Sequence, residues 1–475
     1  MAVSPAYQSL SSWLYLSFGT FIVSVVLYYR LDDGIHSLLM LNTGSACICV
    51  ASLAICVVSV ARSVFVFLRA GGLASKAVRL SLAMSVVSIA LMIGLGEALV
   101  RFSTQSDPEG LIVGDLRLLP REWHQVATYR RRNWDGHASH SGVFLFDPQL
   151  GWTVGPNRKG TGGSHEKLFS SAEGARAGAE GLRFDDRSAR TTIALLGNSY
   201  VFGEDVEYED TWGFHLEQRL GADVQVLNFG VPGYGVDQAY LRYLRDVRER
   251  RPDIAILGVI SHDLIRTTMV YYAVSFAGAA VPGAKPRFSM KNGQLTLVNV
   301  PLPLPEAVYG AQSIQDLPFI DYDQTYRPIE WQRHWYEVSY LLRFAVSWCS
   351  PCGGLGAPND NEETVPLNGA ILHEFVREAT ASGTIPIVVF LPSFREGRDA
   401  SGRLSATPSL GVRILKNAQV DFVDLTDCIK RVDERNQFTS GWHYTPQANS
   451  IMAECLGDIV VSRLQAPATH TTSLP

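Results

Sequence analysis

Long uncharged apolar runs dominate the first hundred residues of this chain. Two runs without a charged side chain cover residues 13–29 and 37–61, and a third, at 81–100, is interrupted only by Glu97 near its end. An α-helix needs about 20 predominantly apolar residues to cross the hydrocarbon core of a bilayer. The first run lacks the charged n-region and small-residue cleavage site of a secretory signal peptide. The pattern therefore predicts three transmembrane helices within residues 1–101, with the lipid bilayer as a partner.

The charges between these runs predict their orientation. The loop between the second and third runs carries only basic charges: Arg62, Arg69, Lys76 and Arg79. In the loop between the first two runs, Arg30 stands beside Asp32 and Asp33. The positive-inside rule places the basic loop in the cytoplasm. The N-terminus is then cytoplasmic as well, and we expect everything after Val100 to be periplasmic or extracellular.

From Thr191 onward, short apolar runs alternate with longer amphipathic segments. The short runs are the expected strands: 193–196, 224–227, 254–260, 385–391 and 420–425. The expected helices between them include 211–220, 237–250 and 370–382. This alternation indicates a parallel sheet with helices on both faces. We therefore expect an α/β domain over 191–465, followed by a flexible tail at 466–475.

Two further regions lack this alternation. Residues 102–190 include a Gly/Ser-rich stretch at 160–181, and we expect them to form an irregular extracytoplasmic linker. Residues 267–366 separate two expected strands and are rich in proline and aromatic side chains. A structureless connection of that length is unusual unless it is functional. We interpret it as an insertion with one helix at 331–348, forming a lid or a wall of a substrate site.

Composition narrows the partners and cofactors. The net charge of −5, without a basic stripe interleaved with aromatic residues, gives no indication of nucleic-acid binding. The histidines of the linker lack the spacing of metal ligands, so we expect no metal and no cofactor: they are His124, His137, His140 and His165.

The cysteines fall into two groups. Three lie inside the second apolar run, where they act as small hydrophobic residues: Cys47, Cys49 and Cys56. Four lie in the part expected outside the cytoplasm, where oxidising conditions permit disulfides. The expected pairs are Cys349 with Cys352, and Cys428 with Cys455. The Cys349-Ser-Pro-Cys352 spacing is also typical of redox or zinc sites, although no second such motif or nearby histidine pair accompanies it.

Polar and glycine-rich segments follow the expected strands, and a histidine lies near the C-terminus. Ligands bind at the carboxyl ends of strands in open α/β sheets. A serine just past a strand and before a helix, as Ser199 is, is how α/β hydrolases expose a nucleophilic hydroxyl. Each segment alone also has a purely structural interpretation: Asn198 and Ser199 cap a helix, the glycines of 228–233 form a turn, and His262 and His443 serve the core or surface.

The order and spacing of these segments resemble the SGNH (GDSL-type) hydrolases. Gly197-Asn-Ser-Tyr-Val-Phe-Gly203 is similar to the first block of that family, and Val226-Leu-Asn-Phe-Gly-Val-Pro-Gly233 to the second. Ser261-His-Asp263 stands where the third block has Gly-x-Asn-Asp, and Gly441-Trp-His-Tyr-Thr-Pro-Gln-Ala-Asn449 is similar to the last. The resemblance covers roughly residues 147–464. It implies a flavodoxin-like three-layer α/β/α fold.

The resemblance also implies roles for individual residues. Ser199 would be the nucleophile and His443 its general base. The backbone N–H groups of Ser199 and Gly233 would form an oxyanion hole, and a ring N–H of His262 would replace the amide of the usual asparagine.

The acid that normally orients the base stands two or three residues before the histidine, and here those positions are Gly441 and Ser440. A backbone carbonyl or Ser440 could orient His443 instead, which would leave a Ser–His dyad. A remote acid such as Asp427 is the other option.

These observations favour a membrane-anchored, extracytoplasmic serine esterase or O-acyltransferase. Its expected substrate is an acyl ester, carried by an envelope or secreted glycan, and it would react through an acyl-serine intermediate. As a transferase it would need a separate membrane protein to supply the acyl group. The alternative is an inactive SGNH-like protein that binds glycan or acts as a scaffold, motivated by the missing acid and by His262.

Overall fold

A computed structural model of the chain describes residues 76–114, 116–186, 189–275, 283–349, 363–394, 396 and 408–465. The predicted spans at 13–29 and 37–61 lie outside the described residues. The predicted tail at 466–475 also lies outside them, as does Cys352 of the first predicted disulfide.

An eight-stranded sheet forms the centre of the C-terminal part, with the order β15-β14-β11-β9-β10-β8-β7-β6. The strands are β6 (Lys159–Thr161), β7 (Lys167–Ser170), β8 (Arg176–Ala177), β9 (Thr191–Gly197), β10 (Val224–Asn228), β11 (Ile254–Val259), β14 (Ile385–Phe390) and β15 (Val423–Asp424). Five neighbouring strands of this sheet, in the order β10-β9-β11-β14-β15, pair in parallel. Counted along the chain, the order of these parallel strands is 2-1-3-4-5, that of flavodoxin. The expected flavodoxin-like sheet is confirmed.

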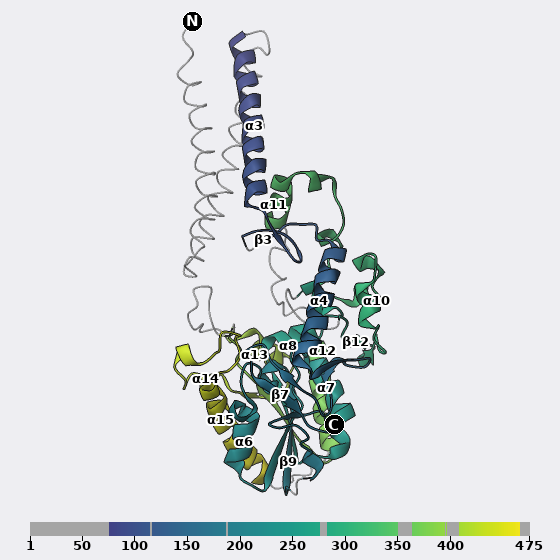
Figure 1. The fold of residues 1–475 in the computed structure, drawn as a ribbon, viewed down its shortest axis with the longest axis vertical. Helices are drawn as coiled ribbons and strands as arrows, with labels where there is room; N and C mark the ends of the chain where they lie inside the picture. The colour runs from purple at the N-terminus through teal and green to yellow at the C-terminus, as the bar shows by residue number, and fades with distance from the viewer. Residues whose placement is uncertain are drawn as a thin grey trace.

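Helices cover both faces of this sheet. Along β9, Ile193 and Leu195 enter one buried cluster with α6 (Trp212–Leu220) and α15 (Pro446–Gln465). Their neighbours Ala194 and Leu196 enter a second cluster on the opposite face. This alternation follows from the two-residue period of a strand. The second cluster is covered by α7 (Val236–Arg242), α12 (Thr364–Ala381) and α13 (Leu410–Asn417). The three layers predicted from the alternating pattern are therefore present (Figure 1).

The region before the parallel sheet is more ordered than the sequence predicted. Within residues 102–190 the structure has helix α4 (Trp123–Ser141) and eight strands: β1 (Gln105–Asp107), β2 (Gly110–Val113), β3 (Leu116–Arg117), β4 (Phe144–Asp147), β5 (Gly151–Val154) and β6 to β8. Strands β6, β7 and β8 are antiparallel and join the main sheet where Arg176 pairs with Asn228. The expectation of an irregular linker was wrong because strands of two to four residues are too short to show a period, and because α4 is largely polar and has only a weak apolar face.

The insertion contains short elements: α9 (Tyr272–Ser275), β12 (Phe288–Lys291), β13 (Gln294–Leu297), α10 (Pro305–Tyr309) and α11 (Tyr340–Cys349). The helix predicted at 331–348 begins only at Tyr340, after a 3₁₀ turn at Trp335–Val338. A fully buried ion pair between Lys285 and Asp237 joins the insertion to α7. Asp237 therefore has a structural role.

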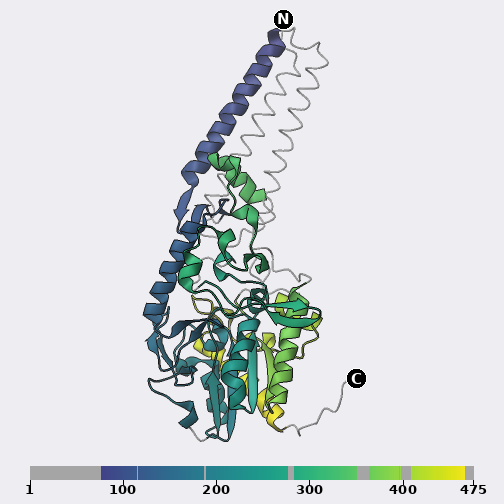
Figure 2. The ribbon, with the colours of Figure 1, turned by 90° about the vertical axis from the view of Figure 1, so that its right-hand side faces the viewer.

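Helix α3 (Lys76–Ser103) extends away from the α/β domain, and α11 lies beside its C-terminal end (Figures 1 and 2). Glu97 joins the two helices, since its carboxylate accepts the N–H groups of Tyr340 and Leu341 at 3.0 and 2.9 Å. The predicted third span, 81–100, falls on α3. Among the residues that the structure describes, no helix has the length and apolar character of a membrane span.

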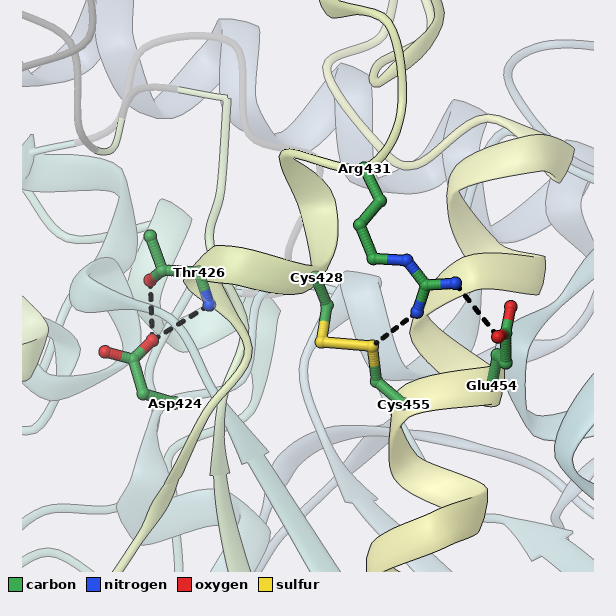
Figure 3. Close-up of a disulfide and its surroundings, with 6 residues drawn as sticks. All are labelled: Asp424, Thr426, Cys428, Arg431, Glu454 and Cys455. Atoms are coloured by element: carbon green, nitrogen blue, oxygen red, sulfur yellow. Dashed lines mark hydrogen bonds and ion pairs between the residues drawn. A yellow bond between two sulfur atoms is a disulfide. The ribbon is translucent and has the colours of Figure 1, made fainter.

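Cys428 of α14 (Thr426–Ile429) and Cys455 of α15 form a disulfide, with their Cα atoms 6.5 Å apart (Figure 3). The predicted Cys428–Cys455 pair is confirmed. Arg431 lies over the bridge and pairs with Glu454 at 2.9 Å. The disulfide joins the two ends of the segment that carries His443.

Candidate active site

The main chain turns sharply between β9 and the short helix α5 (Ser199–Phe202). Gly197 has a φ of 144°, and a Cβ there would lie 2.4 Å from the carbonyl oxygen of Gly258. Asn198 caps α5, because its side-chain oxygen accepts the N–H of Tyr200 at 2.7 Å. The helix-cap interpretation of Asn198 is therefore correct, and it places Ser199 at the first position of the helix. The N–H at that position has no acceptor within its own helix.

Ser199, His443 and Asp205 form a continuous hydrogen-bonded chain. His443 Nε2 lies 2.9 Å from Ser199 Oγ, and its Nδ1 lies 2.7 Å from Asp205 Oδ2. Both distances are those of a nucleophile, its base and an orienting group. The structure thus brings the predicted Ser199 and His443 together and adds a carboxylate. The expected Ser–His dyad is therefore wrong. The structure agrees with the other option, a remote acid, but that acid is Asp205 and not Asp427.

The charge on Asp205 determines how the histidine is protonated. Burial opposes ionisation, but hydrogen bonds from His443, Thr439 and Ser164 lower the pKa of Asp205 to about 2. An ionised carboxylate only accepts hydrogen bonds, so Nδ1 of His443 carries the proton that it donates to Asp205. In the neutral ring Nε2 is then an acceptor for the hydroxyl of Ser199. This is the tautomer that a general base requires.

His443 has a raised affinity for a second proton. Burial alone would lower its pKa, but the hydrogen bond to Asp205 and the charge of Glu204 raise the pKa above its ordinary value. Glu204 Oε2 lies 3.5 Å from His443 Nε2, on the side of the ring that faces Ser199. Burial, with the charges of Asp205 and Glu166, raises the pKa of Glu204 itself, although His443 opposes the shift.

The loop that carries Asp205 is held by residues 102–190, which we call the N-terminal extension. Arg176 of β8 is fully buried and donates to the carbonyl oxygens of Phe202, Gly203 and Val206. The turn between β6 and β7 adds a hydroxyl, since Ser164 Oγ donates to Asp205 Oδ1 at 3.0 Å. The extension therefore contributes directly to the geometry of the site.

The extension also holds the loop that contains Gly233. Trp152 of β5 is buried and donates its Nε1–H to the carbonyl oxygen of Pro232 at 2.8 Å. On the other side of the glycine, the hydroxyl of Tyr234 donates to the carbonyl oxygen of Trp152 at 2.5 Å. Gly233 has a φ of 80°, which glycine adopts without strain. The residues that flank Gly233 are thus both fixed to one tryptophan.

His262 lies on α8 (Ser261–Arg266), which directly follows β11. Its neighbour Asp263 is buried and accepts hydrogen bonds from Asn198 and from Arg266. Burial raises the pKa of Asp263 to about 6, although Arg266 opposes the shift. Asn198 donates its side-chain N–H to the carboxylate of Asp263. An ionised aspartate at position 198 has no hydrogen to donate there. Gly233 and His262 both follow carboxyl ends of parallel strands, at the edge of the sheet where Ser199 lies.

Sequence reasoning missed Asp205. The residue suggested as a remote acid, Asp427, is exposed and pairs with Lys430 at 2.7 Å. Ser440 is also exposed. The available signal was the pair Glu204-Asp205, which directly follows the first motif and lies within one short turn of Ser199.

The fold and this site define the protein as a flavodoxin-like α/β protein with a serine-hydrolase arrangement of Ser199, His443 and Asp205. No model of a known protein family matches the sequence, and no curated protein is significantly similar to it.

Solved structures of lipolytic enzymes are similar in outline. A lipolytic protein of the G-D-S-L family from Desulfitobacterium hafniense has 12% identity and a TM-score of 0.29, over 57% of this chain and 99% of that one. A lipase/acylhydrolase from Enterococcus faecalis has 12% identity and a TM-score of 0.28, over 58% and 95%. The psychrotrophic esterase EstA from Pseudoalteromonas sp. has 10% identity and a TM-score of 0.27, over 58% and 98%. With TM-scores this low, the case for a function rests on the site.

Proposed function

We propose that this protein is an SGNH-type serine enzyme that acts on O-acyl esters through an acyl-Ser199 intermediate. The observation that carries the proposal is the continuous chain from Ser199 Oγ to His443 Nε2 at 2.9 Å and from His443 Nδ1 to Asp205 at 2.7 Å. A serine hydroxyl attacks a carbonyl only when a base takes its proton and the base is held in the correct tautomer.

In the first half of the reaction, His443 Nε2 takes the proton of Ser199 Oγ as the oxygen attacks the acyl carbonyl. The carbonyl oxygen becomes an oxyanion, which the N–H groups of Ser199 and Gly233 and a ring N–H of His262 stabilise. One such donor is worth about 3 kcal/mol of transition-state stabilisation. The imidazolium then returns the proton to the departing alkoxide. The products are an alcohol and acyl-Ser199.

The second half of the reaction repeats these steps with a new acceptor. His443 takes a proton from water or from a sugar hydroxyl, and that oxygen attacks the acyl-serine carbonyl. Collapse of the intermediate breaks the bond to Ser199 Oγ, which recovers its proton from His443. Water makes the enzyme an esterase, and a sugar hydroxyl makes it an O-acyltransferase. In the second case a separate membrane protein would supply the acyl group.

The proposed location is the outer side of a membrane, with a glycan of the envelope or a secreted glycan as substrate. The apolar runs of residues 1–101 and the basic loop between the second and third runs support this orientation. The Cys428–Cys455 disulfide adds support, because such bonds persist in oxidising compartments. A phosphatase reporter that is active only outside the cytoplasm, fused to the C-terminus of the full chain, tests it. A silent reporter with normal expression contradicts the orientation.

The alternative of an inactive glycan-binding or scaffold protein was motivated by the missing orienting acid and by His262 in place of the usual asparagine. Asp205 lies where an orienting acid is needed, so the first motive no longer holds, and the activity of the Ser199 site tests the second.

The decisive experiment measures Ser199-dependent turnover of a chromogenic acetate ester by the full chain purified in detergent. We expect Ser199→Ala to abolish turnover and to abolish labelling by a serine-directed phosphonate. Ser440→Ala is the matched control, because Ser440 is exposed and close to His443 in sequence. Equal turnover and labelling in the Ser199→Ala chain, or none in the parent chain, would contradict the enzyme. Adding an oligosaccharide acceptor then separates transfer from hydrolysis by product mass.

A further inference from the structure

Trp442, which directly precedes His443 in the chain, forms a partly exposed stacked pair with Phe394. The rings of Phe394 and Trp442 are 6.0 Å apart between centroids and only 7° from parallel. Phe394 is 37% exposed and Trp442 is 51% exposed. Phe438 packs edge-on against Phe394 at 5.5 Å and supports the pair. We call Phe394 and Trp442 the aromatic platform.

The aromatic platform is fixed to the residues that flank the reacting groups. Trp442 directly precedes His443, and its carbonyl oxygen accepts the hydroxyl of Tyr200 at 2.5 Å. The same hydroxyl accepts the N–H of Phe394 at 3.1 Å. Tyr200 directly follows Ser199, and its ring lies 5.2 Å from the ring of His443. One buried tyrosine therefore ties both platform residues to the nucleophile and its base.

Trp442 adopts a conformation that favours a much smaller residue. Its φ is 72°, in the left-handed region, where a bulky side chain is rare and costs energy. Glycine would relieve this strain at no steric cost. Strained residues of this kind concentrate at ligand-binding and active sites. The strained residue here directly precedes His443, and its indole is half exposed.

We propose that the aromatic platform binds a sugar ring of the ester substrate, and this inference rests on the proposed ester chemistry at Ser199. A pyranose presents an apolar C–H face and a rim of hydroxyl groups. The flat, partly exposed rings of Phe394 and Trp442 suit the apolar face, whereas a long acyl chain is better served by an enclosed apolar pocket.

The charges around His443 favour a neutral sugar. Glu204 lies 3.5 Å from His443 Nε2 and is 30% exposed, so its carboxylate is placed to accept a hydrogen bond from a hydroxyl beside the ester. Asp205 and Glu166 add negative charge around His443. A uronate or a phosphorylated sugar would be repelled at short range. The substrate class is therefore a neutral, O-acetylated oligosaccharide.

The test compares O-acetylated xylotetraose with 4-nitrophenyl acetate as substrates for the full chain in detergent. Trp442→Gly removes the ring without imposing backbone strain, and Phe394→Leu keeps apolar volume but removes the flat face. We expect the ratio of kcat/KM for the oligosaccharide to kcat/KM for the small ester to fall about tenfold in each variant, mainly through KM. Trp335→Ala is the control, since it removes an exposed tryptophan in the insertion. Thermal melts confirm that each variant is folded.

Several outcomes would overturn the proposal. One is an unchanged ratio in both folded variants. Another is a change in preference between acetate and octanoate esters in place of the sugar effect, which would assign the platform to the acyl chain. Tighter binding of an acetylated oligogalacturonate than of the xylotetraose would reject the neutral sugar. If the parent chain hydrolyses neither ester, the proposed enzyme activity is rejected, but the sugar-binding role of the platform is not. Calorimetric binding of acetylated xylotetraose to the Ser199→Ala chain, weakened about tenfold by Trp442→Gly, then still tests the platform.

Discussion

Asp205 accepts a hydrogen bond from His443 Nδ1 at 2.7 Å, although the two residues are 238 positions apart in the chain. The acid follows Ser199, the proposed nucleophile, by six positions instead of preceding the histidine. Asp205 has a φ of 71°, a left-handed conformation that aspartate tolerates better than most residues. The site thus takes its nucleophile and its acid from one loop, and its base from the C-terminal segment.

Replacing the acid should remove most of the activity. In Asp205→Asn the side chain no longer places a negative charge beside Nδ1 of His443. Its amide can also donate to Nδ1, which favours the tautomer with the proton on Nε2. We expect kcat for the chromogenic ester to fall by about 10⁴, as orienting acids in serine hydrolases are worth this much. Asp427→Asn is the control, because it removes an exposed carboxylate that pairs only on the surface with Lys430. Equal activity of the two variants would show that Asp205 is not the orienting group.

The central parallel sheet and two of the three residues in the Ser199–His443–Asp205 chain followed from the sequence. Long parallel strands such as β9 and β11 are apolar throughout, so their positions were recognisable, and Ser199 and His443 lie in motifs with fixed spacing. Asp205 was not recognisable, because its role depends on how two distant segments meet. A Cβ at Gly441 would lie 2.1 Å from Asp205 Oδ2, so the acid occupies space that a side chain before His443 would need. Only the folded chain shows that Asp205 fills the space where an acid before His443 would otherwise lie.

A methyl group at Gly441 should therefore displace the side chain of Asp205. Gly441→Ala places its Cβ against the Asp205 carboxylate, which must leave its present position on His443 Nδ1. A displacement near 1 Å at such a site costs about 10²-fold in rate, so we expect kcat to fall by about that factor. Gly163→Ala is the matched control, because a Cβ there meets no atom within 4 Å. Unchanged kinetics in folded Gly441→Ala would show that Asp205 need not stay in place.

The pH dependence of activity follows from the charges around His443. The ring must be neutral to act as a base, and its pKa is raised above the ordinary value by Asp205, Glu204 and Glu166 against the opposing effect of burial. Activity should therefore be low in acid and rise through this raised pKa to a plateau at higher pH. Removing a negative charge lowers the pKa, so the rising limb should move to lower pH in Glu204→Gln. The profile of kcat/KM against pH gives the shift directly. A limb that moves to higher pH would contradict this electrostatic account.

Trp152 should affect turnover without touching the substrate. In Trp152→Phe the ring remains but the hydrogen bond from Nε1 to the carbonyl of Pro232 is lost, which loosens the loop at Gly233. We expect kcat to fall about tenfold, a fraction of the 10²–10³ that a lost oxyanion donor costs, with little change in KM.

The matched control for this variant is Trp123→Phe. Trp123 is also buried, and its Nε1–H donates to the carbonyl of Ala311 at 3.1 Å, within the cluster formed by α4 and the insertion. Both variants lose one hydrogen bond worth about 1 kcal/mol of folding stability, so their melting temperatures should fall similarly. A similar loss of kcat in Trp123→Phe would mean that general destabilisation, and not the Gly233 loop, explains the effect.

The Cys428–Cys455 disulfide should stabilise the segment that presents His443 to Ser199. The two cysteines are 27 positions apart, and closing a loop of that size lowers the entropy of the unfolded chain by an amount worth about 3–4 kcal/mol. We expect the Cys428→Ser/Cys455→Ser variant to lose free energy of unfolding of this order in a denaturant titration, and a reductant to reproduce the loss in the parent chain. Glu454→Gln is the control, because it disturbs only the neighbouring pair with Arg431. A variant that unfolds at the same denaturant concentration as the parent would show that the disulfide does not contribute to stability.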